Sequence, residues 1–324
     1  MLVGLVTIFS VSSLVLEVHD KQFFVDQRPT FLLGASYYAG LGASDDFIDK
    51  DLLELRENGF NWIRVWATWG AFGNNVSAVD NDGKAREPYM SRLKSLCGKA
   101  NQLGMIIDVT LSRGNGIVGS GLLPSQEAHI QAVTVLANEL KPFRNVYFDL
   151  ANERNIEDNR HVTMEQLRTL RDRIKDIDPQ RLVTASQGGD ISREELADYL
   201  TKVRVDFITP HRPRHERSPH ETTEKTIEYL SSMQEIGKIV PVHYQEPFRR
   251  GYGLWQPVAE DFLIDLKNAI KGGAAGWCFH NGDTRDVSEN RPRRSFDMRE
   301  TEGSLFDQLD AEEIQVIQQS NCSS

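Results

Sequence analysis

Short apolar runs alternate with longer amphipathic stretches along most of this chain. The runs are rich in β-branched and aromatic residues, as buried strands are. In the stretches between them apolar residues recur every three or four positions, as in helices. This alternation is typical of βα units that build a parallel sheet. The eight runs that we expect to form strands are Phe31–Ser36, Asn61–Ala67, Met105–Leu111, Asn145–Ala151, Arg181–Ser186, Val205–Pro210, Ile239–Gln245 and Ala274–His280.

Signals at their ends delimit the expected helices. Ser44 is placed to cap a helix over Asp45–Asn58, and Gly104 follows a helix over Tyr89–Leu103 at a position that favours a left-handed backbone. The other stretches that we expect to be helical are Glu127–Leu140, Met164–Ile177, Arg193–Lys202, Thr222–Ile236, Val258–Lys271 and Ser304–Gln318. Each expected strand is therefore followed by a helix.

Eight strand–helix units predict a closed (β/α)8 barrel, the TIM barrel of the α/β class. An open doubly wound sheet would give the same alternation, but the segment Tyr37–Gly42 after the first strand lacks the GxGxxG order of a phosphate-binding turn. The chain has 324 residues, 40% of them hydrophobic, and one such barrel takes about 250 residues. We therefore expect a single domain over residues 14–324.

The N-terminus has two interpretations. Met1–Leu16 is mostly apolar, and residues 1–13 could be the remnant of a signal peptide, although a positively charged leading region is missing. On this basis we expect a secreted or periplasmic protein, with a cytoplasmic one as the alternative. Leu14–Val18 and Phe23–Val25 could instead pair as a β-hairpin that closes the bottom of the barrel. Both interpretations hold if cleavage comes just before the hairpin.

The charge balance narrows the class of protein. With 37 Lys and Arg against 47 Asp and Glu, the formal net charge is −10, which argues against a nucleic-acid-binding surface. No stretch after the N-terminus reaches the ~18–20 apolar residues of a membrane span. We expect neither nucleic acid nor membrane as a partner, and the oligomeric state stays open. Cys97, Cys278 and Cys322 are too few for a disulfide framework and lack the spacing of a zinc site.

Two glutamates close two of the expected strands, Glu153 after Asn145–Ala151 and Glu246 after Ile239–Gln245. The C-terminal ends of parallel barrel strands gather on one face, where catalysis takes place, so the two carboxylates should face each other there. Cleavage of a glycosidic bond needs one carboxyl group to protonate the leaving oxygen and a second to trap the positive charge at the sugar carbon. The pair therefore predicts a carbohydrate-cleaving site.

Around these positions the sequence resembles the retaining glycoside hydrolases of clan A, most nearly the cellulase-like enzymes of family five. The resemblance runs along the whole barrel, from Phe31 to about Gln318. It implies a glycosidase that cleaves a β-linked poly- or oligosaccharide by double displacement, with no metal or organic cofactor and a carbohydrate as its partner. The segments that carry it are Gly59–Val65, Leu150–Glu153, Asp206–His211, Pro241–Glu246 and Gly276–Trp277.

The resemblance also assigns roles. It makes Glu153 the acid/base and Glu246 the nucleophile, and it has Asn152 bind the sugar 2-hydroxyl, a contact that strengthens in the transition state. Arg64 would lie beside Glu246 and keep it ionised, because a nearby cation favours the charged carboxylate. For Glu153 we expect partial burial to raise the pKa, so that the side chain keeps the proton for its first task.

Two further residues complete the expected subsite. The resemblance implies that His211 and Trp277 line the place where the bond breaks, and a tryptophan offers a flat apolar face to a sugar ring. Family members often continue past this histidine to a tyrosine that touches the nucleophile, whereas Pro213 stands there in this chain. Tyr244 comes two residues before Glu246, on the same side of an extended strand, so we expect it to supply the missing hydroxyl.

Many arginines fall in the loops at the expected strand ends. Guanidinium groups bind carboxylate and sulfate through bidentate hydrogen bonds, which favours a uronic or sulfated glycan as substrate. The same loops also hold acidic residues such as Glu216 and Asp286, so local ion pairs are the alternative. We expect Arg212 and Arg249 to contact the substrate. The full set is Arg113, Arg154, Arg212, Arg214, Arg217, Arg249, Arg250, Arg285, Arg291, Arg293 and Arg294.

Two other classes of function stay open. A catalytically silent carbohydrate-binding barrel would keep Trp66, Trp69 and Trp277 as sugar platforms, while its carboxylates failed to reach reaction distance. A metal-dependent barrel hydrolase would use His211, His215 and His243, but Pro213 breaks the helical spacing that pairs of metal ligands exploit. A carboxyl separation of about 5 Å would favour the retaining hydrolase over the silent barrel.

Overall fold

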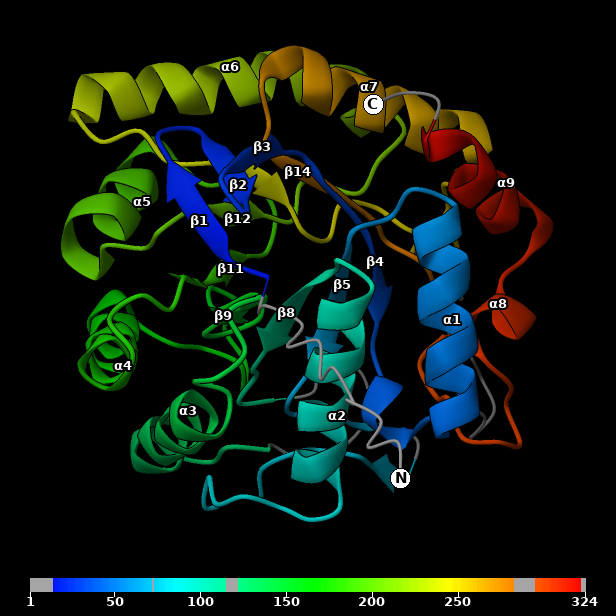
Figure 1. Cartoon of the computed structure of the whole chain (residues 1–324). Helices are drawn as coiled ribbons and strands as arrows, with labels where there is room; N and C mark the ends of the chain where they lie inside the picture. The colour runs from blue at the N-terminus through cyan, green and yellow to red at the C-terminus, as the bar shows by residue number, and fades with distance from the viewer. Residues whose placement is uncertain (1–13, 72, 115–121, 283–294, 322–324) are drawn as a thin grey trace, which may run out of the picture.

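The computed structural model describes residues 14–71, 73–114, 122–282 and 295–321. Within these ranges parallel strands close into a barrel, and helices surround it (Figure 1). The (β/α)8 barrel expected from the sequence is therefore confirmed. The barrel strands are β4 (Leu32–Tyr37), β5 (Trp62–Trp66), β8 (Ile106–Thr110), β9 (Val146–Asp149), β10 (Val183–Thr184) with its continuation β11 (Ser186–Gln187), β12 (Thr209–Pro210), β13 (His243–Tyr244) and β14 (Gly276–Phe279).

Backbone pairing runs around the whole barrel. Seven strands form one sheet in the order β10, β9, β8, β5, β4, β14, β13. Between β10 and β13 the ring is completed by β11, which pairs with β12 through Ser186 and Thr209, and by a parallel bridge from Ile208 to Val242. Outside the barrel, β6 (Gly70–Ala71) and β7 (Asn74–Asn75) form a small antiparallel pair after β5.

Local caps start most of the helices. The Ser44 hydroxyl accepts the backbone N–H of Phe47 at 3.3 Å and begins α1 (Asp45–Glu57). Thr163 and Gln166 satisfy each other's backbone N–H groups in a capping box that begins α4 (Met164–Ile177). The remaining helices are α2 (Tyr89–Gln102), α3 (Gln126–Glu139), α5 (Arg193–Ala197), α6 (Ser218–Ile236), α7 (Ala259–Gly272), α8 (Leu305–Gln308) and α9 (Ala311–Ser320), with a 3-10 turn η1 (Gly40–Gly42) after β4.

Two expected helices are interrupted. The stretch Arg193–Lys202 forms α5 and then a π-helical segment, η2 (Asp198–Val203), which ends at Arg204 with a left-handed φ of 64°. The stretch Ser304–Gln318 is split between α8 and α9, because the Asp310 side chain accepts the N–H of Glu313 at 2.9 Å and starts a new helix. The periodic apolar pattern continues through both breaks and does not reveal them.

An antiparallel sheet covers the N-terminal ends of the barrel strands. It consists of β1 (Leu16–His19), β2 (Gln22–Val25) and β3 (Arg28–Thr30), and it occupies the stretch in which a hairpin is expected. Phe23 of β2 is fully buried, with its ring 5.0 Å from that of Phe207. The sheet thus closes the bottom of the barrel. Residues 1–13, where a signal peptide is expected, lie outside the described residues.

A lower layer inside the barrel separates this sheet from the strand tops. The rings of Trp62 and His243 pack edge to face at 4.6 Å. They fit because neighbouring strands carry glycine: a Cβ on Gly34 would lie 2.0 Å from the Trp62 ring, and one on Gly276 would lie 2.3 Å from Nδ1 of His243. Burial lowers the pKa of His243 to about 3, so this histidine is a neutral part of the core.

Two expectations from composition concern cysteines and membranes. Cys97 and Cys278 are buried free thiols, and Cys322 lies outside the described residues. In the described part of the chain no helix combines the length and the apolar character needed to cross a membrane.

Candidate active site

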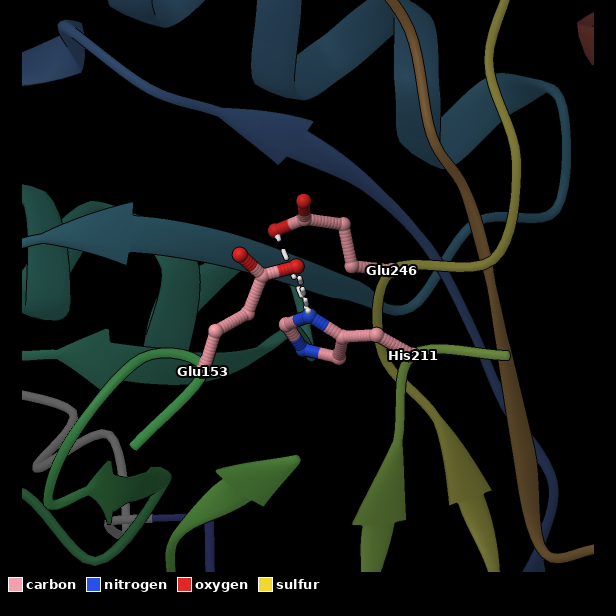
Figure 2. A group of neighbouring side chains, drawn as sticks. All are labelled: Glu153, His211 and Glu246. Atoms are coloured by element: carbon pink, nitrogen blue, oxygen red, sulfur yellow. Dashed lines mark hydrogen bonds and ion pairs between the residues drawn. The ribbon is translucent and has the colours of Figure 1, made fainter. Parts of the chain in front are cut away.

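Glu153 and Glu246 meet at the C-terminal face of the barrel, with His211 beside them (Figure 2). Glu153 follows β9, His211 follows β12 and Glu246 follows β13. One carboxylate oxygen from each glutamate and a ring nitrogen of His211 all lie within 4.8 Å of one another. The expected pairing of the two glutamates across the barrel is therefore present.

The backbone at Glu153 is unusual. Its φ is +46°, in the left-handed region that residues other than glycine rarely adopt. The hydroxyl of Ser186, on the neighbouring strand β11, accepts the N–H of Glu153 at 3.1 Å and helps to hold this conformation. Strained backbone of this kind persists where the surrounding structure enforces it, and it is concentrated at functional sites.

Arg64 on β5 binds Glu246 from below. Its Nη1 donates to Oε2 of Glu246, and the side chain is fully buried. Its Nη2 donates to Asp149 at 3.0 Å, and its Nε donates to the hydroxyl of Thr110 at 3.0 Å and lies 3.5 Å from Asp108. These contacts leave the guanidinium in one position, so the carboxylate of Glu246 is fixed as well.

The surroundings of Glu246 keep it ionised. Burial by itself would raise its pKa, but interactions with its neighbours, among them His211, Arg64 and Arg214, hold the pKa well below its usual value. The expectation that Arg64 lies beside Glu246 and favours its charged form agrees with this arrangement. A carboxylate that stays ionised is ready to act as a nucleophile.

Asn152 presents its amide nitrogen toward the site. Its side-chain oxygen accepts a hydrogen bond from Nη2 of Arg64 at 2.8 Å, which fixes the orientation of the amide. Among the described residues nothing accepts a hydrogen bond from its NH2 group, which is left free for a ligand hydroxyl. This geometry is compatible with the sugar contact that the resemblance implies.

Two arginines bind Glu153 directly, a contact that was expected for neither of them. Nη2 of Arg214 lies 3.2 Å from Oε1 of Glu153 and 2.8 Å from Oε1 of Glu246, so one nitrogen bridges both carboxylates. Nη1 of Arg160 lies 2.7 Å from the other oxygen of Glu153. Arg214 was grouped with the other loop arginines in the sequence, and Arg160 carried no signal that set it apart.

The expected protonation of Glu153 is wrong for this conformation. Burial does raise the pKa of Glu153, as anticipated, but a hydrogen bond with His211 and the positive charge of Arg214 outweigh it and leave the pKa lowered. Sequence reasoning missed this because the lowering comes from a loop side chain whose position no local pattern reveals. In this conformation Glu153 is a carboxylate and holds no proton to donate.

His211 is supported by a polar contact that runs into the barrel. Its Nδ1 lies 3.3 Å from Oε1 of Glu153, and its Nε2 lies 3.5 Å from the side-chain oxygen of Gln245. The amide of Gln245 donates in turn to Asp108, whose pKa burial raises to about 8. Gln245 therefore positions His211, although in the sequence it looked like an ordinary strand residue.

His280 takes the place that was expected for Trp277. It follows β14, is 1% exposed, and its Nε2 lies 3.6 Å from Oε1 of Glu246. Neither ring nitrogen has a hydrogen-bond partner in the described structure. Burial lowers the pKa of His280 well below its usual value, so the ring is neutral and offers one donor and one acceptor beside Glu246.

Trp277 and Tyr244 point away from the site, which corrects both expectations. The Trp277 indole donates to Asp265 of α7 at 2.7 Å, and the Tyr244 hydroxyl bonds to Thr226 of α6 at 2.6 Å. Both side chains lie on the helix side of the barrel wall. The two-residue period failed for Tyr244 because β13 ends at this residue and the chain bends before Glu246.

The position of Trp277 predicts that its substitution affects the stability of the protein more than substrate binding. Trp277→Phe removes the hydrogen bond to the buried Asp265, so the free energy of unfolding should fall by about 1–3 kcal/mol, while KM for a glycoside should change less than about twofold. Thermal unfolding and steady-state kinetics measure the two effects. A large rise in KM with unchanged stability would return Trp277 to the substrate subsite.

Trp66 and Trp69 are also not open sugar platforms. They are 3% and 1% exposed, and their rings pack 5.2 Å from each other. Tyr38 and Phe296 complete this aromatic cluster, with the Trp69 indole donating to the backbone oxygen of Phe296 at 3.0 Å. The cluster packs beside Arg64, whose guanidinium lies 4.9 Å from the Trp66 ring.

Most of the arginines in the loops at the strand ends, which were expected to favour an anionic substrate, form local contacts instead. Arg212 pairs with Asp190 at 2.6 Å, so the expectation that it contacts substrate is wrong. Arg249 is buried and lies 5.4 Å from the ring of Tyr252, which also packs against Arg214 at 4.4 Å. The other described members are Arg113 with Gln166, Arg154 with Glu195, Arg217 with Glu221 and Arg250 with Asp310. Arg285, Arg291, Arg293 and Arg294 lie outside the described residues.

The residues at the site do not fit a metal ion. Glu153, His211 and Glu246 form the one group of possible ligands in the described part of the chain. Their carboxylate oxygens are already bound by the guanidinium groups of Arg64, Arg160 and Arg214. A cation placed there would meet three positive charges at close range. His243 lies in the lower layer, so the histidine set of the metal-dependent alternative is not assembled.

Comparison with known proteins identifies the family and the fold. The cellulase model of glycosyl hydrolase family 5 matches residues 36–232. A family 5 glycoside hydrolase from Bacteroides vulgatus ATCC 8482 has a TM-score of 0.63 at 16% identity, over 84% of this chain and 62% of its own. This chain thus spans under two thirds of that enzyme's length.

Two mannanases are similar over nearly their whole length. The endo-1,4-β-D-mannanase from Thermotoga petrophila RKU-1 has a TM-score of 0.64 at 18% identity, over 90% of this chain and 99% of its own. The endo-1,4-β-mannanase from Rhizomucor miehei has a TM-score of 0.63 at 12% identity, over 95% and 98%. At such identities these structures show a shared fold. No curated protein sequence matches this chain.

Proposed function

This chain belongs to glycosyl hydrolase family 5, and from that premise we propose that it cleaves a β-linked poly- or oligosaccharide with retention of configuration. The observation that supports this most is the spacing of the two glutamates, whose nearest oxygens lie within 4.8 Å. Retaining glycosidases hold their carboxyl groups about 5–5.5 Å apart, whereas inverting ones need room for a water molecule. The spacing also disfavours a silent binding barrel.

In the proposed first step Glu246 attacks the anomeric carbon and forms a glycosyl-enzyme ester. The bond from that carbon to the leaving oxygen breaks, and Glu153 gives this oxygen a proton. In the second step Glu153 takes a proton from water, the hydroxide displaces Glu246, and the sugar leaves with its original configuration. Asn152 binds the 2-hydroxyl, and His280 offers a neutral imidazole to another hydroxyl of the same ring.

We further propose an anionic glycan, uronic or sulfated, as the substrate. The strand-end loop arginines as a group do not support this idea, since most of them have local partners. Support comes instead from Arg214 and Arg249, which lie against the same ring of Tyr252 next to the carboxylate pair. Two guanidinium groups at one place favour a carboxylate or sulfate. The names of the mannanases point to neutral β-mannan as the alternative substrate.

A panel of polysaccharides tests both levels of the proposal. We expect reducing ends to appear from a uronic or sulfated β-glycan, and KM for it to rise with salt as screening weakens each charge. Glu246→Gln protein is the matched blank. Release from β-mannan alone would keep the hydrolase and reject the anionic substrate. Release no greater than the blank on every member would favour the silent binding barrel.

A further inference from the structure

The space between the two carboxylates is filled by a side chain of the protein itself. Nη2 of Arg214 lies within 3.2 Å of an oxygen of Glu153 and within 2.8 Å of an oxygen of Glu246. In the proposed reaction the breaking bond between the anomeric carbon and the leaving oxygen must lie between these two groups. The guanidinium and the sugar cannot occupy that space together, so substrate binding requires Arg214 to move.

The same contact blocks the chemistry in a second way. The first step needs a proton on Glu153, but the charge of Arg214 and the hydrogen bond with His211 lower the pKa of Glu153. Removing Arg214 from the pair would let burial raise this pKa again. The conformation described here is therefore closed both to the sugar and to proton donation, and one movement relieves both obstacles.

We propose that Arg214 is the residue that determines specificity: it closes the catalytic pair in the free protein, and an acidic group on the substrate draws it away. This inference rests on the proposed hydrolase function and gives a reason for its preference for anionic glycans. A sugar carboxylate or sulfate replaces the two ion pairs that Arg214 loses on moving, because both groups accept two hydrogen bonds from a guanidinium. A neutral sugar offers no such partner and leaves the site closed.

The surroundings allow the side chain to turn while its backbone stays fixed. Arg212, two residues earlier, has a left-handed φ of 58° and is held by its ion pair with Asp190. The Nε of Arg214 donates to the backbone oxygen of Pro247 at 3.1 Å and must release this oxygen. The guanidinium also lies 4.4 Å from the ring of Tyr252, and it can keep this contact as it rotates off the carboxylates. Arg249 lies against the same ring at 5.4 Å, and the acidic group would meet both guanidiniums there.

Arg214→Gln tests the proposal through effects of opposite sign. On a neutral aryl β-glycoside kcat/KM should rise about tenfold, because the site is no longer closed, whereas on an acidic glycan it should fall about tenfold or more. The matched control is Arg217→Gln, three residues along the same loop, whose side chain is 78% exposed and which should change neither value more than about twofold. Arg214→Lys keeps the charge and should remain slow on the neutral substrate.

Two further measurements distinguish the proposed closing of the site by Arg214 from a merely structural role. Since Arg214 lowers the pKa of Glu153, the basic limb of kcat/KM for the neutral glycoside should move to higher pH in Arg214→Gln. His211, Arg160 and Glu246 also face Glu153 and are unchanged. Inorganic sulfate should raise the wild-type rate on this substrate by drawing Arg214 away, and should not raise that of the variant. Sulfate inhibition of both proteins alike would overturn the proposal.

The remaining outcomes are also decisive. If kcat/KM of Arg214→Gln fell equally on neutral and acidic substrates, Arg214 would be part of the catalytic machinery, and the proposal that it closes the site would be rejected. Equal gains would reject the link to an acidic substrate. Failure of the hydrolase function itself has a different signature, because wild-type protein would then match Glu246→Gln on the whole panel.

Discussion

Replacing Glu246 with Gln should lower the turnover of a β-glycoside by at least about a thousandfold, because the nucleophile of the proposed reaction is lost. The loss should not come from unfolding, since Gln has nearly the same shape and can still accept a hydrogen bond from Arg64. Glu157→Gln is the matched control: it lies in the loop that follows Glu153, is exposed, and should keep full activity. Near-normal activity of Glu246→Gln would reject the assignment.

Rescue by azide should distinguish the two glutamates. Glu246→Ala opens a space where azide attacks the anomeric carbon directly, so an activated aryl β-glycoside should give the inverted glycosyl azide. Glu153→Ala keeps the nucleophile, so azide should react with the glycosyl-enzyme ester and give the retained product. Product configuration by NMR decides between them. The same configuration from both variants would mean that the two roles are wrongly assigned.

Local signals in the sequence predicted the barrel well. Its strands are buried runs bounded by turn residues, and caps such as Ser44 and the Thr163–Gln166 box mark helix starts independently of tertiary contacts. Positions at strand ends were predictable for the same reason. Glu153, Glu246, Asn152, Arg64 and His211 all lie together because a parallel barrel brings its C-terminal strand ends to one face.

The direction of a side chain near a strand end was harder to predict. On β14, Trp277 and Phe279 face the helices, and the Phe279 ring lies 5.5 Å from Phe262 of α7. Cys278 packs in the inner layer, so alternation places His280 on the inside as well. The resemblance implied that Trp277 lines the subsite, but this two-residue period places it on the helix side, so that expectation is wrong.

Contacts between loop side chains and the two glutamates could not be predicted from the sequence. Arg160 contacts Glu153 only because its loop folds back over the strand end, and Arg214 reaches the carboxylates because Arg212 turns the chain with a left-handed backbone. Whether a loop arginine faces a ligand or a neighbouring acidic side chain depends on the backbone course of its loop. The ion pair between Arg212 and Asp190 shows that the arginine content of these loops was not enough to predict which arginines contact a substrate.

Replacing Arg64 with Met should be the most damaging change outside the two glutamates. Arg64 lowers the pKa of Glu246, which lies well below its usual value, so without Arg64 this pKa should rise. A higher pKa means that Glu246 is protonated up to a higher pH, and the acidic limb of the pH–rate profile should move upward. At the optimum the rate should fall by about two orders of magnitude or more, because Glu246 also loses its fixed position.

The same substitution should make stability depend more steeply on pH. Asp108 and Asp149 lose their buried cation, and breaking a buried ion pair costs about 3–5 kcal/mol. Burial already raises the pKa of Asp108 to about 8 with Arg64 present, so removal of Arg64 should raise the folded-state pKa of Asp108 further. A raised carboxyl pKa makes the folded state bind more protons than the unfolded state, and stability then falls as pH rises above about 4.

Thermal unfolding at several pH values, together with the pH–rate profile, tests both effects of Arg64→Met. The melting temperature of the variant should fall further below that of the wild type at pH 8 than at pH 5. Arg64→Lys keeps a charge but only one of the two arms, so it should recover part of the acidic limb and part of the stability. If Arg64→Met lost stability but kept the wild-type acidic limb, Arg64 would serve the two aspartates alone, and the low pKa of Glu246 would come from His211 and Arg214.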